Sequence, residues 1–149
     1  MAPADAQLDA FLGKFLPEIA TTGRASLARL RALLPEYDAL VYDNYNALAT
    51  GFSPDGKPGS ASLSLAVYPR WVSLFVSASL DDPACILKGE GTRVRHVVLA
   101  GGADDLDRAD IADLIRQTRD RAAHLLGKGR QGKLVIQSVS AKQRPRRPA

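Results

Sequence analysis

The chain has 149 residues, the length of a single domain, and its 46% hydrophobic and 24% charged residues are typical of a globular protein. No apolar run approaches the roughly 20 residues of a membrane span, and the first residues show no secretory signal. The single cysteine, Cys85, excludes an internal disulfide and predicts a reducing, cytoplasmic location. Its apolar neighbours predict that Cys85 is a small buried side chain.

The net charge of +4 is unevenly distributed. Four basic residues with no acid among them lie within the last eight positions: Lys142, Arg144, Arg146 and Arg147. Without them the chain is formally neutral. We therefore predict one domain over residues 1–141 and a basic, flexible tail over 142–149. Nucleic acid or another anionic partner is then expected only through this tail.

The chain is predicted to begin with a helical hairpin. Leucine and phenylalanine recur at spacings of three and four over residues 5–16, and leucine does so over residues 20–34. Pro17 and Pro35 follow these two segments and end them. The apolar stripes of both helices should pack on a sheet.

Residues 40–79 predict a four-stranded antiparallel meander. Apolar and small or polar residues alternate over 61–68 and again over 71–78, the period of a strand with two unlike faces. Two further strands are expected at 40–46 and 47–52, before a hairpin loop at 53–59. One face is aliphatic and should be covered by helices. The other is small, polar and aromatic, and is solvated, lines a pocket or meets a partner.

The rest of the chain completes an α+β fold. A fifth strand is expected at 93–100, a helix at 108–126 and a last strand at 132–139. Asp107 is the predicted N-cap of that helix, with Asp110 completing a capping box. The predicted fold is an antiparallel sheet of about five to six strands, with the helical hairpin and the C-terminal helix packed on one face.

The sequence shows no catalytic constellation, so we predict that the protein is not an enzyme. The loop at 88–92 places two glycines beside Lys88 and either binds an anion through its backbone N–H groups or is a simple connection, which turn chemistry favours. A dense group of acidic residues has two readings. It either collects a hard cation such as iron or satisfies the N–H groups of a helix N-terminus, and the sequence favours the helix N-terminus. This group comprises Asp104, Asp105 and Asp107. No metal or cofactor is predicted, with iron as the alternative.

The segment 42–46 is polar and aromatic, although strands normally avoid Asp and Asn. It is either a strand end that bonds its own backbone or, with the next hairpin, the rim of an aromatic-walled cleft. An unidentified small molecule, a protein or a second copy of the chain would fit such a face. The predicted binding residues are Tyr42, Asp43, Tyr45, Asn46, Tyr68, Arg70, Trp71 and Lys88.

Several short motifs occur in a recognisable order: FLGKFLP, LARLRALLP, VYDNYNALATGFSP, LSLAVYPRWVSLFVS, KGEGTRVRHVVL and LDRADIADLIRQ. Over roughly residues 8–119 the chain resembles the bacterial YdhG-like family, domain of unknown function 1801. The resemblance implies an α+β domain. Some members are described as frataxin-like iron chaperones, a role that uses a carboxylate-rich surface. Here the first helix offers only Asp5 and Asp9, so we carry over the fold and keep iron binding as an alternative.

Overall fold

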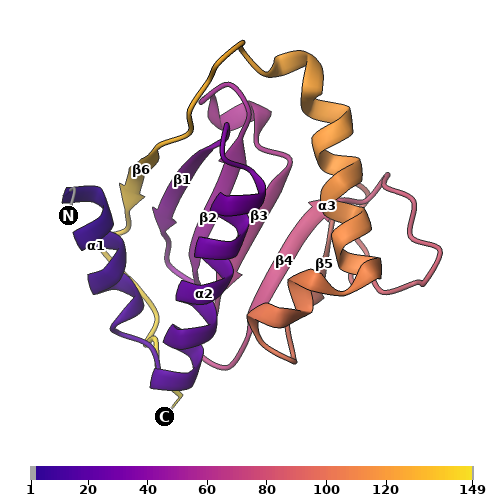
Figure 1. Cartoon of the computed structure of the whole chain (residues 1–149). Helices are drawn as coiled ribbons and strands as arrows, with labels where there is room; N and C mark the ends of the chain where they lie inside the picture. The colour runs from indigo at the N-terminus through magenta and orange to yellow at the C-terminus, as the bar shows by residue number, and fades with distance from the viewer. Residues whose placement is uncertain (1–2, 149) are drawn as a thin grey trace.

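The computed structural model describes residues 3–148 and has two layers. Three helices lie on the same side of a six-stranded sheet: α1 (Pro3–Leu12), α2 (Pro17–Leu33) and α3 (Ala109–Ala122) (Figure 1). Proline begins α2 at a position where a missing backbone N–H costs no helical hydrogen bond. The α+β class, the helical hairpin and the packing of all three helices on one face are confirmed. No helix within the described part of the chain is long and apolar enough to cross a membrane.

The sheet has the order β5-β4-β3-β2-β1-β6. Its strands are β1 (Asp38–Asp43), β2 (Leu48–Ser53), β3 (Leu63–Val67), β4 (Val72–Ser77), β5 (Val94–Val98) and β6 (Leu134–Val139). The predicted meander is confirmed, but β6 runs parallel to β1, so the sheet is mixed. The start of β6 is held beside the start of β1, because the Gly132 N–H donates to the Pro35 carbonyl at 2.8 Å and the Lys133 N–H to Asp38 at 3.0 Å.

The two faces of the sheet differ as the alternation predicts. Leu65 lies opposite Leu74, and both are at most 1% exposed beneath the helices. The alternate register places small residues on the other face, where Ala49 lies opposite Ala66 and Ser64 lies opposite Phe75. Apolar burial therefore concentrates on one side of the sheet, which is the main source of stability. The other side is not covered by any described helix (Figure 1).

The strand directions bring three distant segments to one end of the sheet. β1, β3 and β6 all run in the same direction, since β1 and β6 are parallel and each of β1 and β3 is antiparallel to β2. The turn after β1, the turn after β3 and the chain that leaves β6 therefore meet at the same end. This end carries the candidate site.

Two local predictions are wrong. Arg108, not Asp107, is the N-cap of α3, and no side chain caps it. Asp107 belongs instead to a preceding 3₁₀ turn (Ala103–Asp107), which directs its carboxylate to Arg29 of α2. Cys85 is exposed rather than buried, because it lies in a turn with a left-handed backbone, φ 55°.

Candidate functional site

The helix-free face of the sheet is hollowed along its length. Three hollows adjoin one another, with volumes of about 660, 500 and 410 Å³, and we call them the Trp71, middle and Arg93 hollows. Asn46 and Tyr68 line both of the first two, while Ser64 and Phe75 line both of the last two. The shared lining makes one continuous trough. Small residues such as Ala49 form the floor of this trough at the centre of the sheet.

One wall of the Trp71 hollow is the turn between β3 and β4. The Tyr68 N–H donates to the Trp71 carbonyl at 2.9 Å, which closes the turn around Pro69. The two aromatic rings stack with centroids 5.0 Å apart and planes 26° apart. Trp71 nevertheless remains 43% exposed. The turn therefore presents a braced aromatic surface to the hollow.

The opposite wall is formed by residues 142–148, which we call the strap. Arg146 donates to Asp43 at 2.8 Å and to the Asn44 carbonyl at 2.5 Å, and its guanidinium lies 5.7 Å from the centre of the Phe15 ring. The Arg146 and Asp43 side chains are only 3% and 1% exposed. The Arg144 N–H donates to the Tyr45 carbonyl at 2.9 Å. The strap is thus fixed to the end of β1.

This arrangement differs from the flexible tail that composition predicts. A proline- and arginine-rich segment does not form a core of its own, but it packs where it meets a buried carboxylate that has no other close cation. Asp43 is such a carboxylate, and Lys14, at 3.9 Å, is its only other ion-pair partner in the described chain. As a result, Arg144, Pro145, Arg147 and Pro148 line the hollow together with Tyr68, Arg70 and Trp71. The predicted aromatic cleft and the predicted basic tail form one site.

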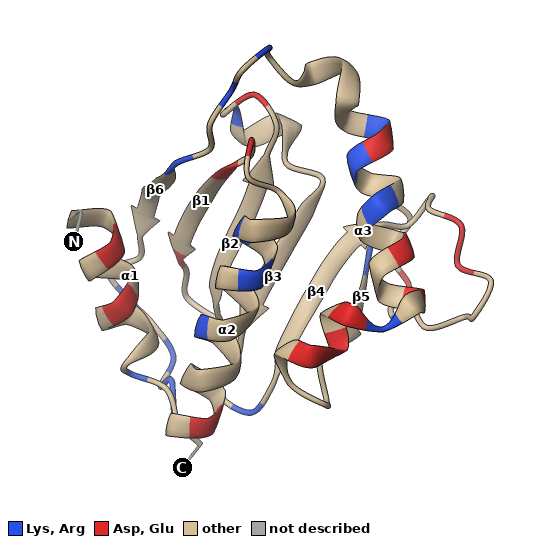
Figure 2. Cartoon of the chain, viewed as in Figure 1, with Lys and Arg blue, Asp and Glu red and all other residues tan. Residues whose placement is uncertain are grey.

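The basic residues of this site differ from those on the helices. Most arginines of the helices have acidic partners: Arg24 pairs with Asp9 at 2.8 Å and Arg119 with Glu36 at 2.9 Å, and Arg121 is the exception among the described residues. Acidic and basic residues accordingly occur together on α3 (Figure 2). Around the Trp71 hollow, by contrast, the described carboxylates form no ion pair with its three arginines, and no Asp or Glu is among its described lining residues. Within residues 3–148, this positive charge therefore has no ion-pair partner.

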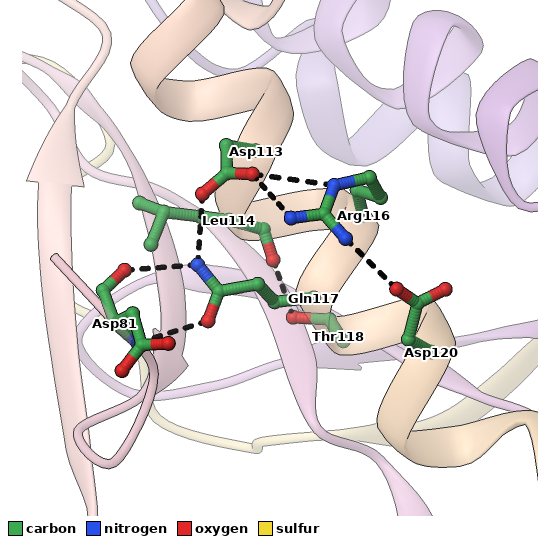
Figure 3. Close-up of polar contacts among 7 residues, drawn as sticks. All are labelled: Asp81, Asp113, Leu114, Arg116, Gln117, Thr118 and Asp120. Atoms are coloured by element: carbon green, nitrogen blue, oxygen red, sulfur yellow. Dashed lines mark hydrogen bonds and ion pairs between the residues drawn. The ribbon is translucent and has the colours of Figure 1, made fainter.

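The acids of α3 are hydrogen-bonded and paired within the helix side (Figure 3). Arg116 bridges Asp113 at 2.5 Å and Asp120 at 2.9 Å. Gln117 donates to Asp113 and to the Asp81 carbonyl, both at 2.9 Å. These hydrogen bonds join α3 to the loop after β4. The cluster is a structural contact in which one arginine serves two carboxylates.

The trough contains six of the eight predicted binding residues. Asn46, Tyr68, Arg70 and Trp71 line the Trp71 hollow, Tyr45 lines the middle hollow and Tyr42 lines the Arg93 hollow. Two predictions fall elsewhere. Asp43 lies buried against Arg146, and Lys88 lies beside β5, where its backbone pairs with His96 at 2.7 and 3.1 Å.

Sequence reasoning missed the strap side of this site: Arg144, Pro145, Arg147 and Pro148. One signal was present in the sequence. Asp43 is an acid in a predicted strand that also contains apolar residues, and a buried carboxylate requires a cationic partner. Nothing local identifies Arg146, which is 103 positions away, as that partner.

The alternative iron site is not assembled. Within residues 3–148, no group of three or more His, Cys, Asp or Glu side chains is placed to hold a metal ion. Asp104 and Asp107 both bind Arg29, and Asp105 accepts a hydrogen bond from the Gly101 N–H at 2.8 Å. These acids therefore join the turn before α3 to α2 and to their own loop.

Comparison of the chain with protein-family models, with curated proteins and with solved structures found no match.

Proposed function

We propose that this protein is a non-enzymatic binding domain that holds a small anionic molecule in the Trp71 hollow, on the mixed face of its sheet. The observation that carries the proposal is one hollow that combines an exposed Trp71 with three arginines, none of which has a carboxylate partner among the described residues. The hollow's volume of about 660 Å³ lies within the range of roughly 300–1,000 Å³ typical of small-molecule sites.

The chemistry of the lining favours an anion. Guanidinium groups donate paired hydrogen bonds to carboxylate and phosphate oxygens, and Arg70, Arg144 and Arg147 face the same space. Burial raises the pKa of Tyr68, so its phenol stays neutral and does not repel a negative ligand. Three like charges without a counter-charge repel one another, and a bound anion relieves that repulsion.

Calorimetric titration with a panel of small anions tests the proposal. The panel comprises inorganic pyrophosphate, citrate and adenosine monophosphate. We expect saturable heat from at least one of them, weakened at least tenfold in Arg144→Gln/Arg147→Gln. Arg121→Gln is the matched control, because Arg121 on α3 also has no acidic partner in the part of the chain that the structure describes, and it donates to the Ser79 carbonyl at 2.9 Å. No saturable heat from any anion, or the same loss in both variants, would refute the proposal.

A second copy of the chain is the competing occupant of this face. Size-exclusion chromatography with light scattering on wild type and Trp71→Ala distinguishes the two. We expect the same monomeric mass for both proteins, with Trp71→Ala reducing ligand binding more than stability. A wild-type dimer that Trp71→Ala dissociates would assign the face to self-association instead.

We also propose that the chain is a bacterial member of the YdhG-like family that acts in the cytoplasm. The order of its motifs and its single cysteine support this proposal. The iron role described for some family members is not extended to this chain, because Asp104 and Asp107 already bind Arg29. Calorimetry with ferrous iron checks this point, and saturable heat would restore the alternative.

A further inference from the structure

We infer that the ligand of the Trp71 hollow is a mononucleotide, whose planar ring stacks on Trp71 and whose phosphate binds Arg144 and Arg147. This inference rests on the proposed anion site and adds the chemical class of the ligand. A mononucleotide site requires an aromatic surface and, at some distance from it, a phosphate-binding group. The hollow has both.

The aromatic surface is preorganised. Tyr68 supports the Trp71 ring from one side at a centroid distance of 5.0 Å, and the turn that carries both rings is closed by a backbone hydrogen bond. Trp71 still exposes 43% of its surface, so its ring retains area for a partner. Stacking of a base on an aromatic side chain is favourable, and it needs little further ordering here.

The phosphate-binding group faces this surface from the strap. Arg144 and Arg147 lie three positions apart on either side of the buried Arg146, which fixes their backbone. Arg147 donates to the Lys14 carbonyl at 3.2 Å through Nε, while the guanidinium of Arg144 lies 5.8 Å from the centre of the Tyr45 ring. Neither contact uses a carboxylate, so each guanidinium retains N–H donors for phosphate oxygens. Asn46, between the two walls, offers an amide to the polar edge of a ring.

The charge distribution favours a mononucleotide over a nucleic-acid strand. A strand that crossed the sheet would place successive phosphates along the whole trough, and single-strand sites follow the backbone with basic side chains. The described lining of the middle hollow contains no Lys or Arg, and that of the Arg93 hollow contains only Arg93. Three of the four arginines along the trough are therefore gathered at the Trp71 end. This placement fits one phosphate group next to one ring.

Trp71 is the only tryptophan of the chain, so its fluorescence reports directly on the site. Adenosine monophosphate, adenosine and inorganic pyrophosphate are titrated separately, and calorimetry provides the affinities for variants that lack the fluorophore. We expect adenosine monophosphate to quench Trp71 saturably and to bind at least tenfold more tightly than either adenosine or pyrophosphate. Trp71→Ala should weaken the nucleotide at least tenfold and leave pyrophosphate unchanged. Arg144→Gln/Arg147→Gln should weaken both.

Two further variants separate stacking from folding. Trp71→Phe retains an aromatic ring and should keep the nucleotide affinity within about threefold, a change of less than 0.7 kcal/mol. His96 lies on the same sheet face, in β5 beside Phe75 of β4. His96→Ala should leave the nucleotide affinity unchanged. Circular dichroism of every variant verifies that it is folded.

The outcomes are distinguishable. If pyrophosphate or citrate binds but adenosine monophosphate binds no more tightly, the nucleotide inference is overturned and the anion site stands. If none of them binds, both fall. An eight-nucleotide oligoadenylate that binds far more tightly than the mononucleotide, with an affinity that increases with length and decreases steeply with salt, would overturn the mononucleotide in favour of a strand.

Discussion

The buried contact between Asp43 and Arg146 makes the strongest quantitative prediction, because it fixes the strap that forms half of the site. Arg146→Met keeps a side chain of similar length and removes the charge and its hydrogen-bond donors. The substitution leaves Asp43, 1% exposed, without the guanidinium that contacts it at 2.8 Å. It also removes the cation that lies 5.7 Å from the Phe15 ring centre.

The expected cost follows from these contacts. Removing one partner of a buried ion pair destabilises a protein by about 3–5 kcal/mol, since the remaining charge is left in a poorly solvated site. Residues 142–148 belong to no helix or strand, so local detachment of the strap lets water reach Asp43 and limits the loss. We therefore expect a decrease of about 3 kcal/mol in the free energy of unfolding, the lower end of that range.

Urea denaturation measures this loss through Trp71 fluorescence and circular dichroism. With a slope of about 2 kcal/mol per molar urea, the midpoint should decrease by about 1.5 M. The matched control is Arg147→Met in the same strap, whose side chain is exposed and should cost less than about 0.5 kcal/mol. The double variant Asp43→Asn/Arg146→Met should lose less than the sum of the two single variants, because neither charge then remains unpaired.

Equal and small losses in Arg146→Met and Arg147→Met would refute this reasoning. That result would mean that Arg146 is not buried against Asp43 and that the strap is not fixed. Nucleotide binding that survives Arg146→Met unchanged would contradict the same point at the level of the site, because the strap positions Arg144 and Arg147.

The remaining predictions concern the frame that supports the site. Gly132→Ala should destabilise the protein by about 3 kcal/mol or more in urea denaturation, because a Cβ there would lie 1.8 Å from the Tyr37 carbonyl oxygen, whereas Gly127→Ala, with open space around it, should be nearly neutral. Hydrogen bonds from Arg119 hold the pKa of Glu36 below its usual value. The pair therefore stabilises the fold at a pH above the usual pKa of a carboxyl group, and this stabilisation is lost as the pH falls through the lowered pKa. Glu36→Gln should therefore cost less than about 1 kcal/mol at pH 7 and show a smaller decrease in stability between pH 7 and pH 3, and an unchanged acid dependence would contradict the assignment.

Local patterns in the chain encode the helical hairpin, the strands and the two faces of the sheet. The alternation through Ser64, Leu65 and Ala66 predicts both a strand and its two faces, because side chains of a strand point to opposite sides in turn. Prolines and leucine spacings placed the helical hairpin in the same way. The aromatic wall of the site was equally visible, since Tyr68, Arg70 and Trp71 lie within one short turn.

The wall opposite these aromatic residues, in contrast, depends on how distant strands pair. The parallel pairing of β6 with β1 brings the chain after Val139 to the end of the sheet where the turns after β1 and β3 also lie. There a buried carboxylate meets an arginine 103 positions away, a contact that offsets part of the desolvation of both charges. Propensity and periodicity extend over a few residues, whereas this contact depends on strand order and direction. Composition thus predicts a solvated tail for the arginine-rich segment, whereas in the folded chain the same segment forms one wall of a hollow.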